Sequence, residues 1–166
     1  LTVANIIRHD CEVTIENENI RPIDFDDVPD LVGIAVTVDV LPRAIEIASI
    51  YRQKGVKVIA GGIHITTASS SVPKDAFDSL CIGFAENTWP QIIEDMKHNG
   101  LQSEYVSKPL TSGNDIVAPA YDMIDKTDYL WYNVVSTSRS CPHTCDFCYN
   151  SSGTHQYINR NIDDVL

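Results

Sequence analysis

The sequence lacks any run of about 20 apolar residues that could cross a membrane, and nothing in it resembles a signal peptide. These two absences argue against a membrane protein or a secreted one. Since cytoplasmic thiols stay reduced, the cysteines are expected to be available as metal ligands. The sequence therefore predicts a cytoplasmic protein that does not bind membranes.

Basic residues are scarce. The 166 residues contain 12 Lys and Arg against 23 Asp and Glu, a formal net charge of −11 at pH 7. This balance argues against sequence-independent binding of nucleic acid or of an anionic membrane. Internal repeats and low-complexity tracts are absent, and 43% of the residues are apolar. The chain can therefore form one ordinary domain, or one domain and part of the next.

Three of the five cysteines, Cys141, Cys145 and Cys148, lie within eight residues at C-x3-C-x2-C spacing. Soft sulfur ligands so close together suit one centre of zinc, copper(I) or iron and sulfide. A four-iron cluster normally takes four protein thiolates, so three thiols leave either an incomplete site or one iron open to another ligand. The alternative is a zinc site that borrows His143 or His155 as its fourth ligand.

Hydrophobic periodicity predicts alternating strands and helices. The expected elements are the last turns of a helix at 1–7, strands at 11–16, 31–36, 56–60, 79–82 and 101–106, and helices at 41–54 and 88–99, the second opened by a capping box of Thr88 with Gln91. Strands that are apolar on both faces belong in a parallel sheet covered by helices. The sequence therefore predicts a doubly wound α/β sheet of Rossmann or flavodoxin type.

Ligands of such sheets bind outside the carboxyl ends of the strands. Three loops occupy that place here: Thr37-Val38-Asp39, Gly61-Gly62-Ile63-His64 and Gly83-Phe84-Ala85-Glu86. Glycines at a strand end permit positive φ angles and let a bulky ligand approach the backbone. A tight turn with no ligand would have the same composition, so both interpretations stay open.

The cysteine segment resembles the signature loop of the radical S-adenosylmethionine enzymes, because an aromatic residue, Phe147, directly precedes Cys148. The resemblance implies that Cys141, Cys145 and Cys148 hold a 4Fe-4S cluster whose open iron binds S-adenosylmethionine. It also implies that Phe147 contacts the adenine of S-adenosylmethionine.

The α/β segment is similar to the cobalamin-binding subfamily of these enzymes, including the anaerobic magnesium-protoporphyrin monomethyl ester oxidative cyclases. The similarity rests on three phrases, at residues 37–44, 61–66 and 85–90. It implies that cobalamin is held by Thr37, Val38, Asp39, Gly61, Gly62, His64, Gly83 and Glu86. It also implies a cobalamin-binding domain at 1–107 whose first strand precedes Leu1, a linker at 108–128, and the start of a (β/α) barrel at 129–166. That start comprises a strand at 130–138 and the cysteine loop.

These resemblances predict a segment of an enzyme, either an oxidative cyclase or a C-methyltransferase, that is inactive without the rest of the barrel. The barrel would bind a small-molecule substrate, and a flavodoxin or ferredoxin would supply electrons. An unpaired sheet edge could also produce a strand-swapped homo-oligomer. Two alternatives remain: a radical enzyme of methylthiotransferase type whose α/β domain binds no cobalamin, and a zinc-binding interaction module without catalysis.

Overall fold

A computed structural model describes residues 1–98, 100–130, 134–149 and 157–165. It divides the chain into two compact units, one formed by Asp24–Lys108 and the other by Leu1–Ile23 together with Pro109–Leu166. The sequence placed residues 1–107 in one domain, whereas the structure groups the first 23 residues with the carboxyl-terminal segment. Each unit is described by itself.

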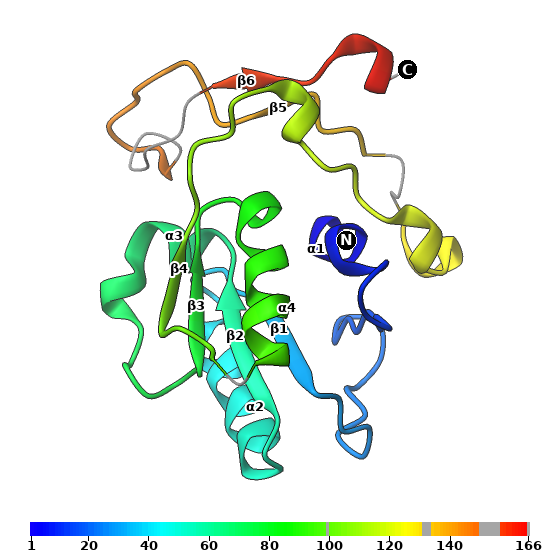
Figure 1. Ribbon diagram of the computed structural model, residues 1–166, viewed down its shortest axis with the longest axis vertical. Coiled ribbons are helices and arrows are strands. Elements are labelled where there is room, and N and C mark those ends of the chain that lie inside the picture. Colours follow the sequence, from blue (N-terminus) through cyan, green and yellow to red (C-terminus); the bar gives the residue numbers. More distant parts are fainter. Residues whose placement is uncertain (99, 131–133, 150–156, 166) are drawn as a thin grey trace. The chain divides into compact units, whose positions relative to one another are not determined.

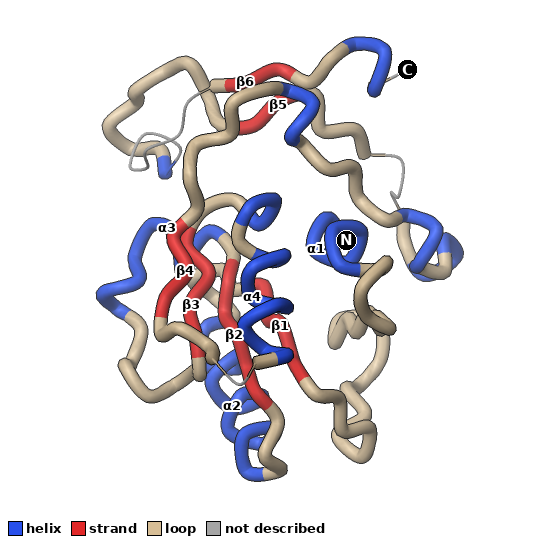
Figure 2. The backbone as a smooth tube through the Cα atoms, viewed as in Figure 1, coloured by secondary structure: helices blue, strands red, loops and turns tan. Residues whose placement is uncertain are grey.

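The unit Asp24–Lys108 is built on a four-stranded sheet of order β1-β2-β3-β4, and every pair of neighbouring strands is parallel (Figures 1 and 2). Its strands are β1 (Leu31–Ala35), β2 (Lys57–Gly61), β3 (Ser79–Ile82) and β4 (Glu104–Val106). Its helices are α2 (Leu41–Gln53), α3 (Ile63–Ala68) and α4 (Trp89–Lys97), with 3₁₀ turns η1 (Ser69–Ser71) and η2 (Ala85–Asn87). The predicted α/β sheet is confirmed.

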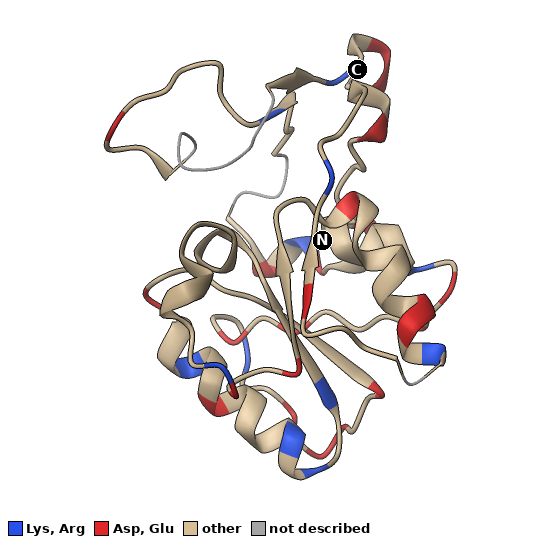
Figure 3. Cartoon of the chain, turned by 60° about the vertical axis from the view of Figure 1, so that its left-hand side comes forward, with Lys and Arg blue, Asp and Glu red and all other residues tan. Residues whose placement is uncertain are grey.

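Helices cover both faces of this sheet. Figures 1 and 3 show α2 and α3 on one face and α4 on the other. Val58, Ile59 and Ala60 of β2 are fully buried between these layers. Helix α2 begins with a proline in its first turn, buries Ala44 and Ala48, and ends before a glycine with positive φ.

Helix α4 packs its first residue against β1. A Cβ atom on Gly33 would lie 2.7 Å from the Trp89 ring, so only glycine lets the indole approach this strand. The predicted capping box does not form, because the Thr88 side chain makes no bond to the helix amides. Its buried hydroxyl instead lies 3.1 Å from both the Phe84 carbonyl and the Cys81 sulfur. A hydroxyl turned into the core cannot also cap the helix.

Helix α3 is not among the helices that the sequence predicts. Its β-branched residues have low helix propensity, which hid it from periodicity. Ile65 is fully buried, and its burial stabilises a helix that the helix propensities of its residues alone would not support.

The predicted strand at 11–16 is wrong. The expected alternation exists, with Cys11, Val13 and Ile15 half-buried between exposed neighbours, but these residues belong to no strand. An extended segment becomes a strand only when a neighbour accepts its hydrogen bonds, and none of the described strands pairs with this one. Within the described part of the chain, β1 likewise pairs with β2 alone.

The described residues of the second unit contain little regular structure. Its elements are α1 (Thr2–Ile7), 3₁₀ turns η3 (Gly113–Asp115), η4 (Tyr121–Met123), η5 (Lys126–Asp128) and η7 (Ile162–Asp164), and a two-stranded antiparallel sheet of β5 (Ser138–Arg139) with β6 (Ile158–Asn159). Helix α1 confirms the predicted helix at 1–7. Polar side chains join distant parts of this unit. Arg8 forms two bonds of 2.9 and 2.6 Å with Asp122.

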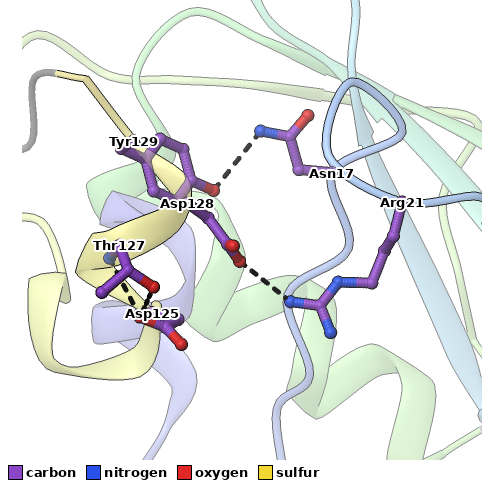
Figure 4. A network of polar contacts seen from close by, with 6 residues as sticks. All are labelled: Asn17, Arg21, Asp125, Thr127, Asp128 and Tyr129. Atoms are coloured by element: carbon purple, nitrogen blue, oxygen red, sulfur yellow. Dashed lines mark hydrogen bonds and ion pairs between the residues drawn. The ribbon is translucent and has the colours of Figure 1, made fainter.

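A second polar network in this unit is drawn in Figure 4. The Asn17 amide lies 3.3 Å from the Tyr129 hydroxyl, and Arg21 lies 3.2 Å from Asp128. Asp125 accepts bonds from the backbone N–H and hydroxyl of Thr127 and so caps η5. The predicted linker at 108–128 therefore contains three short turns held by side-chain bonds.

The predicted barrel strand at 130–138 lies partly outside the described residues, which omit 131–133. Its described part is irregular until Ser138–Arg139, which pairs antiparallel with β6. The start of a parallel barrel therefore stays a prediction.

Of the helices that the structure describes, none is both long and apolar enough to cross a bilayer. Figure 3 shows acidic and basic residues interspersed along α2 and α4.

Candidate functional site

The three loops predicted to bind a ligand follow β1, β2 and β3, and the structure brings their first residues together at one edge of the sheet. We call the set Val36, Gly61, Gly62, Gly83, Phe84 and Ser107 the strand-end rim. The first two loops are joined through the backbone. The Val36 amide donates to the Gly61 carbonyl at 2.8 Å, and the His64 amide donates to the Val36 carbonyl at 3.1 Å.

Gly62 makes this junction possible. Its φ is +98°, which side chains rarely adopt, and a Cβ atom on it would lie 2.8 Å from the Val36 nitrogen and 2.9 Å from the Val36 oxygen. Both requirements admit only glycine. The sequence identified Gly62 as a ligand-approach residue, and the structure shows that its own fold already requires glycine there.

The second and third loops are joined by a side chain. The Thr66 hydroxyl donates to the Gly62 carbonyl at 2.9 Å and accepts the Gly83 amide at 3.0 Å. Gly83 is the other glycine of the rim with positive φ, at +91°. One hydroxyl therefore fixes the two glycine turns relative to each other.

A second hydroxyl joins the third loop to the end of β4. Ser107 accepts the Phe84 amide at 2.9 Å through its hydroxyl, and its own amide donates to the Ile82 carbonyl at 2.8 Å. A Cβ atom on Gly83 would overlap the Ser107 side chain. The rim is thus bonded from β1 to β4.

The first loop presents a carboxylate to solvent. The Thr37 hydroxyl donates to Asp39 at 2.5 Å. This bond, assisted by backbone N–H groups of the loop, holds the pKa of Asp39 below its ordinary value. Val38 is 72% exposed beside it. The loop therefore offers an ionised acceptor and an uncovered apolar side chain.

His64 lies in the first turn of α3, directly after the glycines of the second predicted loop, and its hydrogen bond with Ser71 indicates its tautomer. The Ser71 hydroxyl donates its single proton to the Ala68 carbonyl at 2.7 Å, so the His64 Nε2 atom, 3.1 Å from the same hydroxyl, must be the donor. In the neutral ring the Nδ1 atom keeps the lone pair. If His64 accepts a hydrogen bond from a ligand at this rim, the accepting atom is therefore Nδ1.

Glu86 lies in η2 on the third loop, near the buried thiol of Cys81. Burial raises the pKa of Cys81, the hydrogen bond with Thr88 lowers it, and the Glu86 charge raises it further. A buried thiol of this kind is a poor nucleophile. We therefore regard Cys81, which is 3% exposed, as part of the core.

An open depression lies along α2, between this helix and the segment that precedes β3. It is lined by Ile45, Ser49, Arg52, Gln53, Asp75 and Ala76. The Arg52 guanidinium is already bonded to the Asp75 carbonyl and lies 3.3 Å from Asp78. None of these lining residues belongs to the rim, and parallel α/β sheets bind ligands at the carboxyl ends of their strands. We therefore assign the candidate site to the rim.

The cysteine loop belongs to the other unit. Cys145 is exposed, Cys141 and Cys148 are half-buried, and all three remain thiols. The Cys148 amide donates to the Cys145 carbonyl at 3.0 Å, which closes a turn between them. Nevertheless, among the described residues no three His, Cys, Asp or Glu side chains converge as metal ligands. His143 is exposed, and His155 lies outside the described residues.

Phe147 is 93% exposed on this loop. Its predicted contact with adenine stays a prediction, as do the ligand roles of the three cysteines. The chemistry of the donor set still fits an iron–sulfur cluster, since thiolates are the ligands that such clusters take.

Sequence reasoning missed Thr66 and Ser107. Ser107 could have been found, since it directly follows the predicted strand at 101–106 and so had to lie at the rim. Thr66 could not, because its second partner is 17 residues away and only the folded sheet brings the two together.

Two curated proteins are similar to this chain. Bacteriochlorophyllide d C-8(2)-methyltransferase of Chlorobaculum tepidum is 29% identical over 160 residues, which cover 93% of this chain and 35% of that protein. An uncharacterised methyltransferase of Pyrococcus horikoshii is 27% identical over 180 residues, covering 90% of this chain and 39% of that protein. The chain thus spans little more than a third of the relatives it matches, and both are methyltransferases.

No family model matches the chain. No solved structure matches it either.

Proposed function

We propose that this chain is part of a cobalamin-dependent radical S-adenosylmethionine methyltransferase. The observation that carries the proposal is the set of three free thiols, one exposed and two half-buried, at C-x3-C-x2-C spacing in a chain similar to methyltransferases. Methyl transfer is preferred to oxidative cyclisation because both relatives are named for it.

Cys141, Cys145 and Cys148 would hold a 4Fe-4S cluster. Three thiolates leave one iron without a protein ligand, which suits chelation of S-adenosylmethionine. The turn from Cys145 to Cys148 already brings two ligand positions close. Cluster assembly would require the loop to bring Cys141 towards them.

The strand-end rim would hold the corrinoid. Its two glycine turns expose backbone to a large ligand, and Val38, the Asp39 carboxylate and the Nδ1 atom of His64 offer both apolar and polar contacts. Exposed loops carried by a rigid sheet are the usual setting for ligand binding in this architecture. The remaining contacts, from Glu86 and the first loop, would complete the same edge.

When bound, the cluster and S-adenosylmethionine supply a carbon radical, and the cobalamin supplies the methyl group. The cofactors carry this chemistry, while the chain positions them. In that division of work the rim and the cysteine loop are two separate binding sites of one enzyme. The substrate and an electron donor such as a flavodoxin or ferredoxin would be bound elsewhere in the whole protein.

Anaerobic reconstitution of the 166-residue chain tests the cluster. With iron, sulfide and reductant we expect about four iron atoms per chain, together with the broad visible absorbance of an iron–sulfur protein. Binding of about one zinc per chain in preference to iron would instead favour the zinc-binding module.

Titration with cobalamin, followed by its visible spectrum and by equilibrium dialysis, tests the rim separately. Saturable binding of one cobalamin per chain is expected. Iron binding without cobalamin binding would favour a radical enzyme of methylthiotransferase type.

A further inference from the structure

We propose that Thr66 is a positioning residue of the corrinoid site: its hydroxyl sets the separation of the two glycine turns before any ligand arrives. This inference rests on the proposed function for its ligand, but the bond geometry stands independently of it. Thr66 touches neither a cofactor nor a substrate in this role. It acts through Gly62 and Gly83.

The hydroxyl of Thr66 is fully used by the two turns. Its proton goes to the Gly62 carbonyl at 2.9 Å, and its oxygen accepts the Gly83 amide at 3.0 Å. The Thr66 amide also donates to the Gly62 carbonyl, at 3.0 Å. The residue is thus anchored to the first turn by two bonds and reaches the second with its side chain.

The other junctions of the rim differ in kind. The β1 and β2 ends are joined by backbone bonds, which no substitution of a side chain removes directly. Ser107 joins β3 to β4 from beyond the end of β4. Thr66 therefore offers a way to loosen the two glycine turns from each other without cutting the sheet.

Fixed turns lower the cost of ligand binding, because ordering that occurs during folding does not have to occur again on association. Without the hydroxyl, the Gly83 amide loses its acceptor, and the turn must move or admit water to satisfy it. A part-buried amide without an acceptor destabilises the conformation in which the two turns are held together. The cost corresponds to about a tenfold change in the equilibrium between that conformation and looser ones. We expect Thr66→Val to weaken cobalamin binding by about this factor.

Thr67 supplies a matched control. It has the same side chain, lies in the same helix, and donates its hydroxyl to the Ile63 carbonyl at 2.9 Å, one turn earlier. That bond stays within α3 and its neighbouring turn. Thr67→Val therefore repeats the loss of a helix hydroxyl without touching the link to Gly83.

The experiment compares the unchanged 166-residue chain with Thr66→Val, Thr66→Ser and Thr67→Val. Cobalamin affinity is measured by spectroscopic titration well below the melting temperature of each variant. Protection of the Gly83 amide is measured without ligand, by hydrogen exchange detected by NMR. Thr66→Val should lose Gly83 protection and bind about tenfold more weakly. Thr66→Ser should restore both properties, and Thr67→Val should retain both.

Equal affinity of the unchanged chain and Thr66→Val would overturn the inference, as would equal losses in Thr66→Val and Thr67→Val. Failure of the unchanged chain to bind cobalamin would refute the corrinoid assignment itself. Loss of Gly83 protection in Thr66→Val would then give Thr66 a purely structural role, which also overturns the inference. The two failures are therefore distinguishable.

Discussion

The strand-end rim and the cysteine loop both carry candidate cofactor contacts, and they differ in what holds them in place. The rim is bonded from β1 to β4 through backbone groups and the hydroxyls of Thr66 and Ser107. The cysteine loop has exposed side chains such as Phe147, and its thiols do not converge. One site is arranged by folding, whereas the other would be arranged by the metal it binds.

This difference matches the chemistry of the two ligands. A metal–thiolate bond is strong enough to order a loop as it forms. A corrinoid held by many weak contacts gains more from turns that are fixed in advance. Changes in the cysteine loop should therefore affect cofactor content, and changes in the rim should affect folding stability as well.

The largest expected effect is on iron content. Replacing Cys141, Cys145 and Cys148 together by alanine should reduce reconstituted iron from about four atoms per chain to background, with no change in the melting temperature of the apo protein. The reason is that these side chains support no described core. Iron analysis and differential scanning calorimetry measure the two quantities.

Cys11→Ala is the control for this experiment, because Cys11 is a half-buried thiol outside the loop. It should leave the iron content unchanged. A large fall in the apo melting temperature of the triple variant would show that the loop is part of the folded core, and the contrast between the two regions would then disappear.

The edge at which the rim forms could be predicted from the sequence. Apolar runs marked β1, β2 and β3 to within a residue at each end, and parallel strands place the loops that follow them side by side. The side-chain bonds that Thr66 makes between those loops could not be predicted, because they depend on a side-chain direction that no periodicity records.

The second prediction tests whether the rim is held by close backbone packing. Gly62→Ala should destabilise the α/β unit by about 3 kcal/mol or more, since alanine adds the cost of a backbone region that is essentially restricted to glycine (φ 98°, ψ −173°), about 1–3 kcal/mol, to an overlap with the Val36 backbone of about 1–3 kcal/mol. Gly55→Ala is matched to it. Its φ is +84°, but nothing lies within 4 Å of the added Cβ.

Gly55→Ala should therefore cost only about 1 kcal/mol. Urea unfolding of both variants, analysed with a common slope, measures how much more Gly62→Ala costs through its overlap with Val36 and its Gly-only backbone region together. If the two variants lose equal stability, the close approach of Gly62 to Val36 does not contribute to folding.

Two sequence predictions failed for related physical reasons. The segment at 11–16 has the alternation of a strand but no partner, and Thr88 has the composition of a cap but a hydroxyl directed into the core. In both cases the local pattern was correct and a tertiary bond decided the structure. Such bonds are the part of a fold that composition and period do not contain.

The third prediction concerns the edge of the sheet. The Val36 amide and carbonyl point toward β2 and the residues that follow it. Backbone groups of successive strand residues point to opposite sides, so the Ala35 amide and carbonyl point away from β2. No described strand pairs with β1 on that side. Open edges recruit other chains, and we expect self-association there. Ala35→Pro removes an amide from that side alone and should shift the chain toward monomer.

Val106→Pro makes the same kind of change on β4, the opposite edge strand, and is expected to have a smaller effect because that strand has only three residues. Sedimentation velocity over a range of concentrations measures the association. A chain that stays monomeric at all concentrations would contradict the predicted homo-oligomer.

The smallest expected effect lies at a polar network away from the rim. The Tyr105 hydroxyl donates to Asp95 at 2.6 Å, and the Gln102 side chain donates to the same carboxylate oxygen at 3.0 Å. These bonds, the one from Tyr105 first, hold the pKa of Asp95 below its ordinary value. Tyr105→Phe removes the larger cause, so the pKa of Asp95 should rise toward that value.

The sign of the resulting pH dependence follows from the direction of this shift. A carboxyl whose pKa is lower in the folded state contributes stability above its unfolded pKa, and loses it as the pH falls through the folded value.

The unchanged protein should therefore exceed Tyr105→Phe in stability by a constant amount at neutral pH, smaller than the loss in Gly62→Ala. This difference should narrow as the pH falls below the ordinary pKa of an aspartate, about 4, and then through the lower pKa that Asp95 has in the folded protein. Part of the stability difference should persist at low pH. The backbone N–H of Gln102 also donates to the Tyr105 hydroxyl oxygen, at 3.1 Å, and that bond does not titrate. Urea unfolding of both proteins across the acidic range measures the difference. A difference independent of pH would show that the Asp95 carboxylate does not contribute to stability through Tyr105.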